Sequence, residues 1–307
     1  MSENELFKND DIEKKIRSYL PSPFISAALP LRDVHKHVFE RKYNNITLYL
    51  QGLKNVPFGK YGRLLLSVIT THAVISEDSE CVINYKNLNE LLSEMQLPKQ
   101  RGKDIKEQLD LFSKSSFSYE QKVSKRITNA LFKEMDYDKE NFMATAVRYE
   151  NIPFCKGISY VECDDGSEKK NYIAFSVNLS RDFVDFCKGH SVPIDYTVYK
   201  DITSPLGKDI YAWLIYRNNI MDNLPLFIKK EDIINQFMPV SSTADYNATI
   251  NVNWKYIKDM IEDIKKKYYP ELKYEVSFEG LTLYKSRAVI NEDDKRYVLI
   301  TAGGSVV

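Results

Sequence analysis

The residues NLNELLSEMQLPKQRGKDIKEQLDLF, at positions 87–112, decide the fold that the sequence predicts. Apolar residues recur at helical spacing on both sides of Pro98, first at 88, 91, 92 and 95 and then at 105, 109 and 112. Asn87 is placed to cap the first helix, and Pro98 ends it. Two short amphipathic helices joined by a tight turn that contains glycine are typical of a helix-turn-helix.

The flanking segments supply the other elements of a winged helix. Residues 59–75 predict a long amphipathic helix, and residues 81–85 predict a short strand between it and the helix-turn-helix. Further strands are predicted at 117–123, 158–163 and 172–177, with a turn at Asp164-Asp165-Gly166 joining the last two. Residues 124–156 are charged and weakly periodic, so we expect an elaboration between the wing strands.

The same order recurs in the C-terminal part, beyond a predicted linker at 189–195. Ser204-Pro205 starts a helix, with proline at the first helical position. The remaining elements are a helix at 233–237, a long loop from Met238 to Asn253, a helix at 254–264 and a hairpin over 272–286. The predicted fold class is therefore α+β, with tandem winged-helix domains.

The predicted domain boundaries follow from these patterns. Residues 1–40 are expected to be a polar lead-in, with a short helix through Ile12, Ile16 and Tyr19 that Pro21 and Pro23 stop. A strand is predicted at 44–52, where apolar residues alternate. We divide the chain into the lead-in 1–40, a first winged-helix domain with an elaborated wing at 41–190, a second winged-helix domain at 191–290 and a C-terminal tail at 291–307.

The composition is that of a globular chain without a general affinity for nucleic acid. Of 307 residues, 43 are Lys or Arg and 43 are Asp or Glu, so the net charge is zero and only local charge can attract DNA. No apolar run approaches the ~18 residues of a membrane span. The start of the chain is polar and acidic, and the four cysteines show no C-x-x-C spacing. We expect a cytoplasmic protein with reduced thiols and no membrane partner.

Basic residues gather where the last helix of the first helix-turn-helix begins. They are Lys99, Arg101, Lys103 and Lys106, with the uncharged Gln100 among them, and all five lie opposite the apolar stripe. Residues 98–106 hold four basic residues and one acidic residue, a net charge of +3. A recognition helix presents its N-terminal part to the major groove, where Arg or Lys pairs with guanine and Gln with adenine. On charge alone, a solvated helix surface is the better interpretation.

The second unit carries a weaker signal at the equivalent place. Asn251, Asn253, Lys255 and Lys258 occupy it, and a plain amphipathic surface explains them nearly as well. Lys285 and Arg287 follow the second wing and are candidates for phosphate contacts. From the first wing, Lys122, Lys125 and Arg126 are similar candidates, although a disordered basic loop fits them equally well.

Two motifs suggest enzymatic chemistry, and neither is complete. The pairs Gly59-Lys60, Gly102-Lys103 and Gly207-Lys208 lack the other residues of a phosphate-binding loop, so ATP hydrolysis is not supported; Arg63 is expected to be a surface or phosphate contact. His35 and His37 flank Lys36, and a metal site there would make the chain a rolling-circle nicking initiator. Two exposed imidazoles are the favoured interpretation. We therefore predict no catalytic residue, no metal and no cofactor, and we expect His72 and His190 to be structural and both tryptophans to lie in the core.

Six segments resemble plasmid-encoded RepA-type replication initiators. They are NNITLYLQG (44–52), VPFGKYGRLLLSVITTHAV (56–74), LNELLSEMQLPKQRGKDIKEQL (88–109), SVPIDYTVY (191–199), SPLGKDIYAWLIYR (204–217) and GLTLYKS (280–286). The GRLLL and DIYAWLIYR runs are fairly specific together. The resemblance covers roughly residues 44–290, with gaps around 124–170 and 238–252, and the long loop at Met238 departs from the family pattern.

The resemblance implies a function. It implies a protein that binds repeated double-stranded origin DNA of a plasmid, assists origin opening and recruits host replication initiation and helicase-loading proteins. It also implies a homodimer that represses its own gene, and it implies no enzyme. With the resemblance, DNA contact becomes the favoured interpretation of the basic residues at 99–106. The alternatives that stay open are the metal-dependent nicking initiator and a winged-helix transcriptional regulator.

Overall fold

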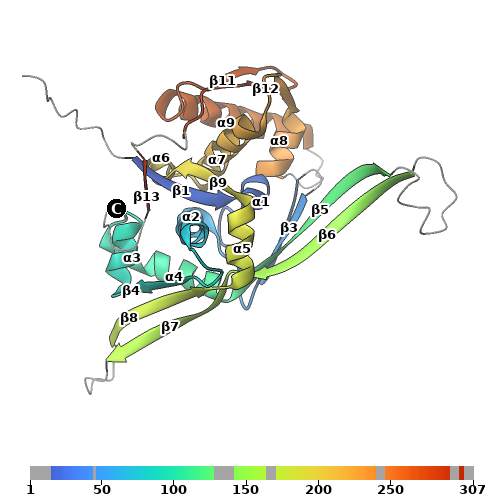
Figure 1. Cartoon of the computed structure of the whole chain (residues 1–307). Helices are drawn as coiled ribbons and strands as arrows, with labels where there is room; N and C mark the ends of the chain where they lie inside the picture. Colours follow the sequence, from blue (N-terminus) through green and yellow to red (C-terminus); the bar gives the residue numbers. More distant parts are fainter. Residues whose placement is uncertain are drawn as a thin grey trace, which may run out of the picture.

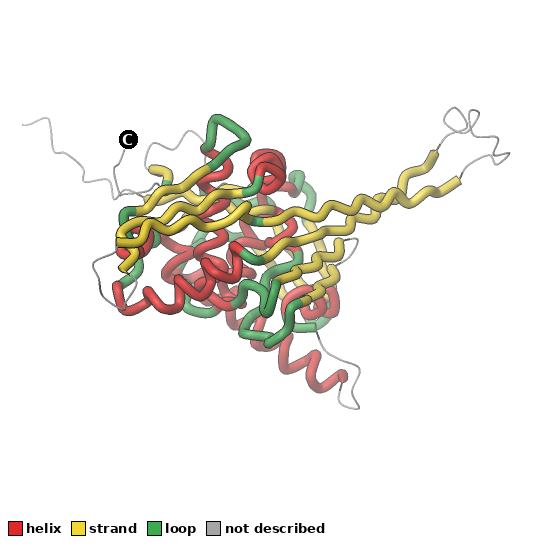
Figure 2. Tube along the Cα trace, turned by 90° about the horizontal axis from the view of Figure 1, so that it is seen from below, coloured by secondary structure: helices red, strands yellow, loops and turns green. Residues whose placement is uncertain are grey.

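The computed structural model describes residues 15–43, 46–127, 142–163, 171–239, 246–290 and 297–300. The described chain is a mixed α+β fold in which helices pack around four small sheets (Figure 1). A two-stranded ribbon projects from this body, as seen from below in Figure 2. No helix in the described ranges combines the length and the apolar character that a bilayer span requires.

The first unit has the predicted order of elements. It consists of α2 (Gly59–Ile75), β4 (Val82–Tyr85), α3 (Leu88–Glu94), the 3-10 turn η1 (Lys99–Arg101), α4 (Gly102–Ser113), β7 (Cys155–Cys163) and β8 (Asn171–Leu179). The side-chain oxygen of Asn87 accepts a hydrogen bond from the Glu90 amide at 3.2 Å, which confirms the predicted cap. The three strands form one sheet in the order β4-β8-β7.

The second unit repeats this order. It consists of α7 (Pro205–Ile220), β10 (Leu226–Lys229), α8 (Lys230–Phe237), α9 (Tyr246–Lys267), β11 (Lys273–Val276) and β12 (Gly280–Tyr284). Its sheet runs β10-β12-β11, so in both units the last strand lies between the first and the second. The Ser204 hydroxyl accepts a hydrogen bond from the Gly207 amide at 3.2 Å, and Pro205 is the first helical residue, as predicted.

Residues 115–153 differ from the prediction. The strand expected at 117–123 is not a wing strand: it belongs to β5 (Ser115–Ile127), which pairs with β6 (Phe142–Pro153) from Ser116↔Pro153 to Ile127↔Phe142. With β2 (Val38–Tyr43) and β3 (Ile46–Gly52), these strands form a sheet separate from that of β4, β7 and β8, in the order β2-β3-β5-β6. Figure 1 labels the two strands of the projecting ribbon as β5 and β6. The turn predicted at Asp164-Asp165-Gly166 lies outside the described residues.

Two local predictions around the first unit are wrong. Ile16 and Tyr19, predicted to lie in a short helix, belong to a strand, β1 (Lys15–Pro21), while Ile12 lies outside the described residues. Pro23 lies in the first turn of α1 (Ser22–Ser26) instead of ending a helix. The linker predicted at 189–195 is the end of α5 (Arg181–His190) and a strand, β9 (Ser191–Asp195). β1 pairs with β9 and, in parallel, with β13 (Tyr297–Leu299). These pairings join segments far apart in the sequence and outweigh the local helix and loop signals.

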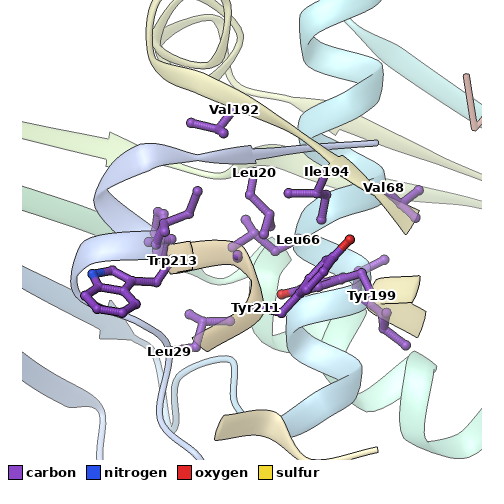
Figure 3. Close-up of a cluster of buried hydrophobic side chains, with 14 of the residues drawn as sticks. Leu20, Leu29, Leu66, Val68, Val192, Ile194, Tyr199, Tyr211 and Trp213 are labelled. Carbon is purple, nitrogen blue, oxygen red and sulfur yellow. The ribbon is translucent and has the colours of Figure 1, made fainter. Parts of the chain in front are cut away.

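One hydrophobic core runs through both units. Figure 3 shows Leu20 of β1, Leu66 of α2, Ile194 of β9, and Tyr199 and Tyr211 of α6 (Tyr196–Asp201) and α7 in one cluster. The predicted burial of both tryptophans is confirmed, with Trp213 at 0% and Trp254 at 4% exposed. The two units are therefore packed through shared apolar side chains instead of being joined by a free linker.

Candidate nucleic-acid interface

The predicted recognition residues of the first unit all lie on the solvent side of η1 and α4. Ile105, Leu109 and Phe112 are 0%, 3% and 0% exposed and form the face packed on the core. The opposite side is exposed and carries Lys99, Gln100, Arg101, Lys103 and Lys106. The turn is tight because Gly102 is buried against α3: a Cβ there would lie 3.2 Å from Leu88 Cδ2. The sequence therefore predicted this cluster correctly as an exposed surface.

The start of α2 extends the same surface. The Tyr61 ring lies between two cations, with Lys60 Nζ 4.9 Å and Arg101 Cζ 5.9 Å from its centroid. Arg101 also lies 3.7 Å from Asp104, in an exposed contact of the kind that contributes little stability. We call the seven residues 60, 61, 99, 100, 101, 103 and 106 the first basic surface. The sequence analysis missed Lys60 and Tyr61 in this role because Gly59-Lys60 was considered only as part of a phosphate-binding loop.

The second unit differs from the prediction at its third helix. The helix begins at Tyr246, and Ile250 is 3% exposed in line with Trp254, so the long loop expected up to Asn253 is wrong. Residues 240–245 are outside the described ranges. Asn253 is half-buried in the third turn of α9, and Lys255 is exposed. Lys258 is half-buried, with its ammonium 6.0 Å from the Trp254 ring centroid.

The residues predicted to contact phosphates from the two wings differ in their surroundings. Lys285 Nζ donates hydrogen bonds to the carbonyls of Asn218 at 2.7 Å and Met221 at 2.8 Å, at the end of α7. A phosphate would have to compete with these two bonds, while Arg287 is exposed. Lys122, Lys125 and Arg126 belong to β5 of the ribbon, so their assignment to the first wing is wrong.

Arg63 is a buried link between the two units and not a surface contact. It is 2% exposed, and its Nε and Nη2 donate to the two carboxylate oxygens of Asp209, each at 2.6 Å. The remaining donors reach the carbonyls of Leu29 at 2.6 Å, Pro30 at 3.0 Å and Gly59 at 2.9 Å. All five N–H groups of the guanidinium are therefore used. The pair ties α2 of the first unit to α7 of the second.

Two more cations surround this pair. Lys208 is 0% exposed, and its ammonium donates to the carbonyls of Tyr199 and Lys200. Burial, and to a lesser extent the nearby charge of Arg63, lower the pKa of Lys208 to about 7. Burial likewise lowers the pKa of Arg41 to about 10. The charges of Arg63, Arg41 and Lys208 all act on the Asp209 carboxylate, and Arg63 is the one that bonds to it directly.

The histidines do not converge. The His35 side chain is 85% exposed and its Nδ1 lies 3.2 Å from Asp33, while the main-chain oxygen of His37 accepts the Gly52 amide. Over the described ranges, no three His, Cys, Asp or Glu side chains are grouped so that they could hold a metal ion. His72 Nε2 lies 2.6 Å from the buried Glu94, which also accepts the Tyr85 hydroxyl, so His72 is part of the core packing.

Comparison with known proteins gives a likeness in overall structure only. No protein-family model matches the chain, and no curated protein matches it. A crystal structure of RctB domains 2-3 (RctB-155-483) is 12% identical, with a TM-score of 0.47 over 85% of this chain and 95% of that one. A structure of selenomethionine derivatives of domain 2 and domain 3 of RctB is 10% identical, with a TM-score of 0.49 over 88% and 99%. The function is therefore argued from the side chains of this chain.

Proposed function

We propose that the two units are tandem winged helices and that the chain binds double-stranded DNA sequence-specifically, with α4 and α9 as recognition helices. The observation that carries the proposal is the exposure of Lys99, Gln100 and Arg101 in the turn η1 and of Lys103 in the first turn of α4. In a helix-turn-helix these positions face base edges in the major groove. Arg and Lys donate to guanine O6 and N7, and Gln pairs with adenine.

Within this class, we propose a plasmid replication initiator. The support is the motif resemblance of six segments, two of which contain Arg63 and Asp209 and are joined by the buried pair. In this role the chain binds repeated origin DNA in the cytoplasm, assists its opening, and works with host replication initiation and helicase-loading proteins. It acts by binding, without catalysis, metal or cofactor, and as a homodimer in part of its cycle. Mass measurement with and without DNA tests the dimer.

The test of DNA binding uses the first basic surface. Fluorescence anisotropy on duplexes that cover the DNA beside the gene locates the site, and footprinting shows whether direct repeats lie beside an A·T-rich stretch, as at an origin. Arg101→Ala is expected to relax preference at one base pair, at a cost of about 1–3 kcal/mol for the preferred base. Lys103→Ala is expected to weaken all duplexes alike and to reduce the salt slope by about 0.9.

A matched control lies at the opposite end of α4 from the first basic surface. Lys114 follows the C-terminal end of α4, where it lies 2.5 Å from Asp110, and Lys114→Ala removes the same charge outside the first basic surface. We expect this variant to bind DNA like the parent. Parent-like affinity and base preference in both Arg101→Ala and Lys103→Ala would show that α4 does not read DNA.

A further inference from the structure

The charged residues on the exposed side of α9 differ between the two halves of the helix. The helix packs on the core through residues that are at most 4% exposed, namely Ile250, Trp254, Ile257, Ile261 and Ile264. Residues 247–258 contain Lys255 and Lys258 and no acidic residue, whereas residues 259–263 contain three acidic residues, Asp259, Glu262 and Asp263. Carboxylates repel phosphates, so only the N-terminal half of α9 is suited to lie in a DNA groove. That half is also the one that a recognition helix presents to base edges.

The N-terminal half of α9 exposes mostly uncharged side chains. Val252 is 67% and Tyr256 49% exposed, and Asn251 is exposed beside them. Val252 and Tyr256 are four residues apart and are therefore neighbours on the helix surface. These two apolar side chains lie next to each other in solvent on the helix face that we propose reads DNA, so they can make apolar contacts with a bound duplex.

The chemistry of these side chains differs from that of α4. The first basic surface offers Lys99 and Arg101, which pair with guanine, beside Gln100, which pairs with adenine. Asn pairs in a bidentate manner with adenine N6 and N7, and an apolar side chain contacts the C5 methyl group of thymine. Adenine and thymine occur together in one base pair, so Asn251 and Val252 favour the same kind of sequence.

We infer that the chain reads a composite site, in which α4 selects guanine-containing base pairs and α9 selects A·T pairs through Asn251 and Val252, with Tyr256 extending the apolar contact. The inference rests on the proposed DNA-binding function and specifies its substrate. The site is then asymmetric, with a G-containing half and an A·T half. The two halves follow the two units of one chain, which the shared core and the Arg63–Asp209 pair hold in one arrangement.

The experiment begins with the full chain and a pool of random 30-base-pair duplexes. The selected site is expected to contain an A·T-rich half and a G-containing half. Asn251→Ala is expected to lose about 5- to 150-fold of the discrimination for adenine in the A·T half, and Arg101→Ala is expected to change only the other half. Leu224→Ala is the control, since Leu224 is 78% exposed in the second unit outside α9.

The proposed contact of Val252 with thymine can be tested by removing one methyl group from the DNA. Replacing the contacted thymine by uracil removes only the C5 methyl group, and we expect the parent chain to bind that duplex about fourfold more weakly, as for one buried methylene group. Val252→Ala is expected to reduce the difference in affinity between the thymine and uracil duplexes without abolishing it, because the alanine methyl group and Tyr256 still offer apolar contact. A selected second half rich in G·C pairs, or no effect of any thymine-to-uracil change on the parent, would overturn the inference while leaving DNA binding intact. Binding to no duplex in the pool would overturn the proposed function itself.

Discussion

Removal of the buried Arg63 guanidinium should destabilise the whole chain. Arg63→Met keeps the length of the side chain but leaves the 5% exposed Asp209 without its bidentate partner and frees the carbonyls of Leu29, Pro30 and Gly59. Breaking one side of a buried ion pair costs about 3–5 kcal/mol. With an unfolding entropy of about 2.1 cal/mol/K per residue, a chain of this length should lose about 5–8 °C in Tm.

A double-mutant cycle separates the pair from its surroundings. Asp209→Leu leaves three basic side chains, Arg41, Arg63 and Lys208, without the carboxylate, so its cost should be at least as large as that of Arg63→Met. The double variant removes both charges and should cost clearly less than the sum of the two single changes. Urea unfolding followed by tryptophan fluorescence measures all three variants, because both tryptophans are buried in the second unit.

The exposed Lys114–Asp110 pair provides the control. Its two side chains are 50% and 56% exposed and 2.5 Å apart, and such surface pairs contribute below about 1 kcal/mol. Lys114→Met should therefore barely change the free energy of unfolding. A loss below about 1 kcal/mol in Arg63→Met, or single losses that simply add in the double variant, would refute the reasoning that this pair joins the two units.

Three further predictions concern single positions. The pKa of Lys208 is lowered to about 7 in the folded chain, so between pH 7 and the ordinary lysine pKa of 10.5 the unfolded chain binds more protons than the folded chain. The free energy of unfolding should therefore rise over pH 7–8.5 by up to about 1.4 kcal/mol per pH unit. Lys208→Met should flatten this rise in thermal melts. Gly280→Ala places a Cβ 2.1 Å from the Ile228 main-chain oxygen and should separate β10 from β12, so tryptophan fluorescence should change at a lower urea concentration than in the parent. Gly189→Ala is the control, because a Cβ there meets nothing within 4 Å and should leave stability unchanged. Lys285→Met should lower the free energy of unfolding by about 1 kcal/mol because two carbonyls at the end of α7 lose their donor; weaker binding to all duplexes with a salt slope reduced by about one would instead assign Lys285 to phosphate contact.

Short-range signals in the sequence were sufficient for the helices of both units. The period of apolar residues and the caps Asn87 and Ser204 placed α2, α3 and α7 correctly, because these signals act within one or two helical turns. The exposed cluster at 99–106 followed from the same periodicity, since residues opposite a buried stripe face solvent. α9 is the exception: its start was predicted eight residues too late, at Trp254 instead of Tyr246. Ile250 continues the apolar stripe, but the residues around it, Asn247, Thr249, Asn251 and Asn253, have low helix propensity.

The sequence by itself thus determined α2, α3, α4 and α7, their buried faces and the exposure of the first basic surface, all of which depend on residues close together in the chain. Only the tertiary structure decided that β1 is a strand, because its partners are residues 191–195 and 297–299. Only the tertiary structure brought Arg63 and Asp209 together, at 146 residues of separation, and Lys60 and Tyr61 beside Arg101. Strand pairing and buried ion pairs depend on which distant segments meet, and no local period in the sequence records that.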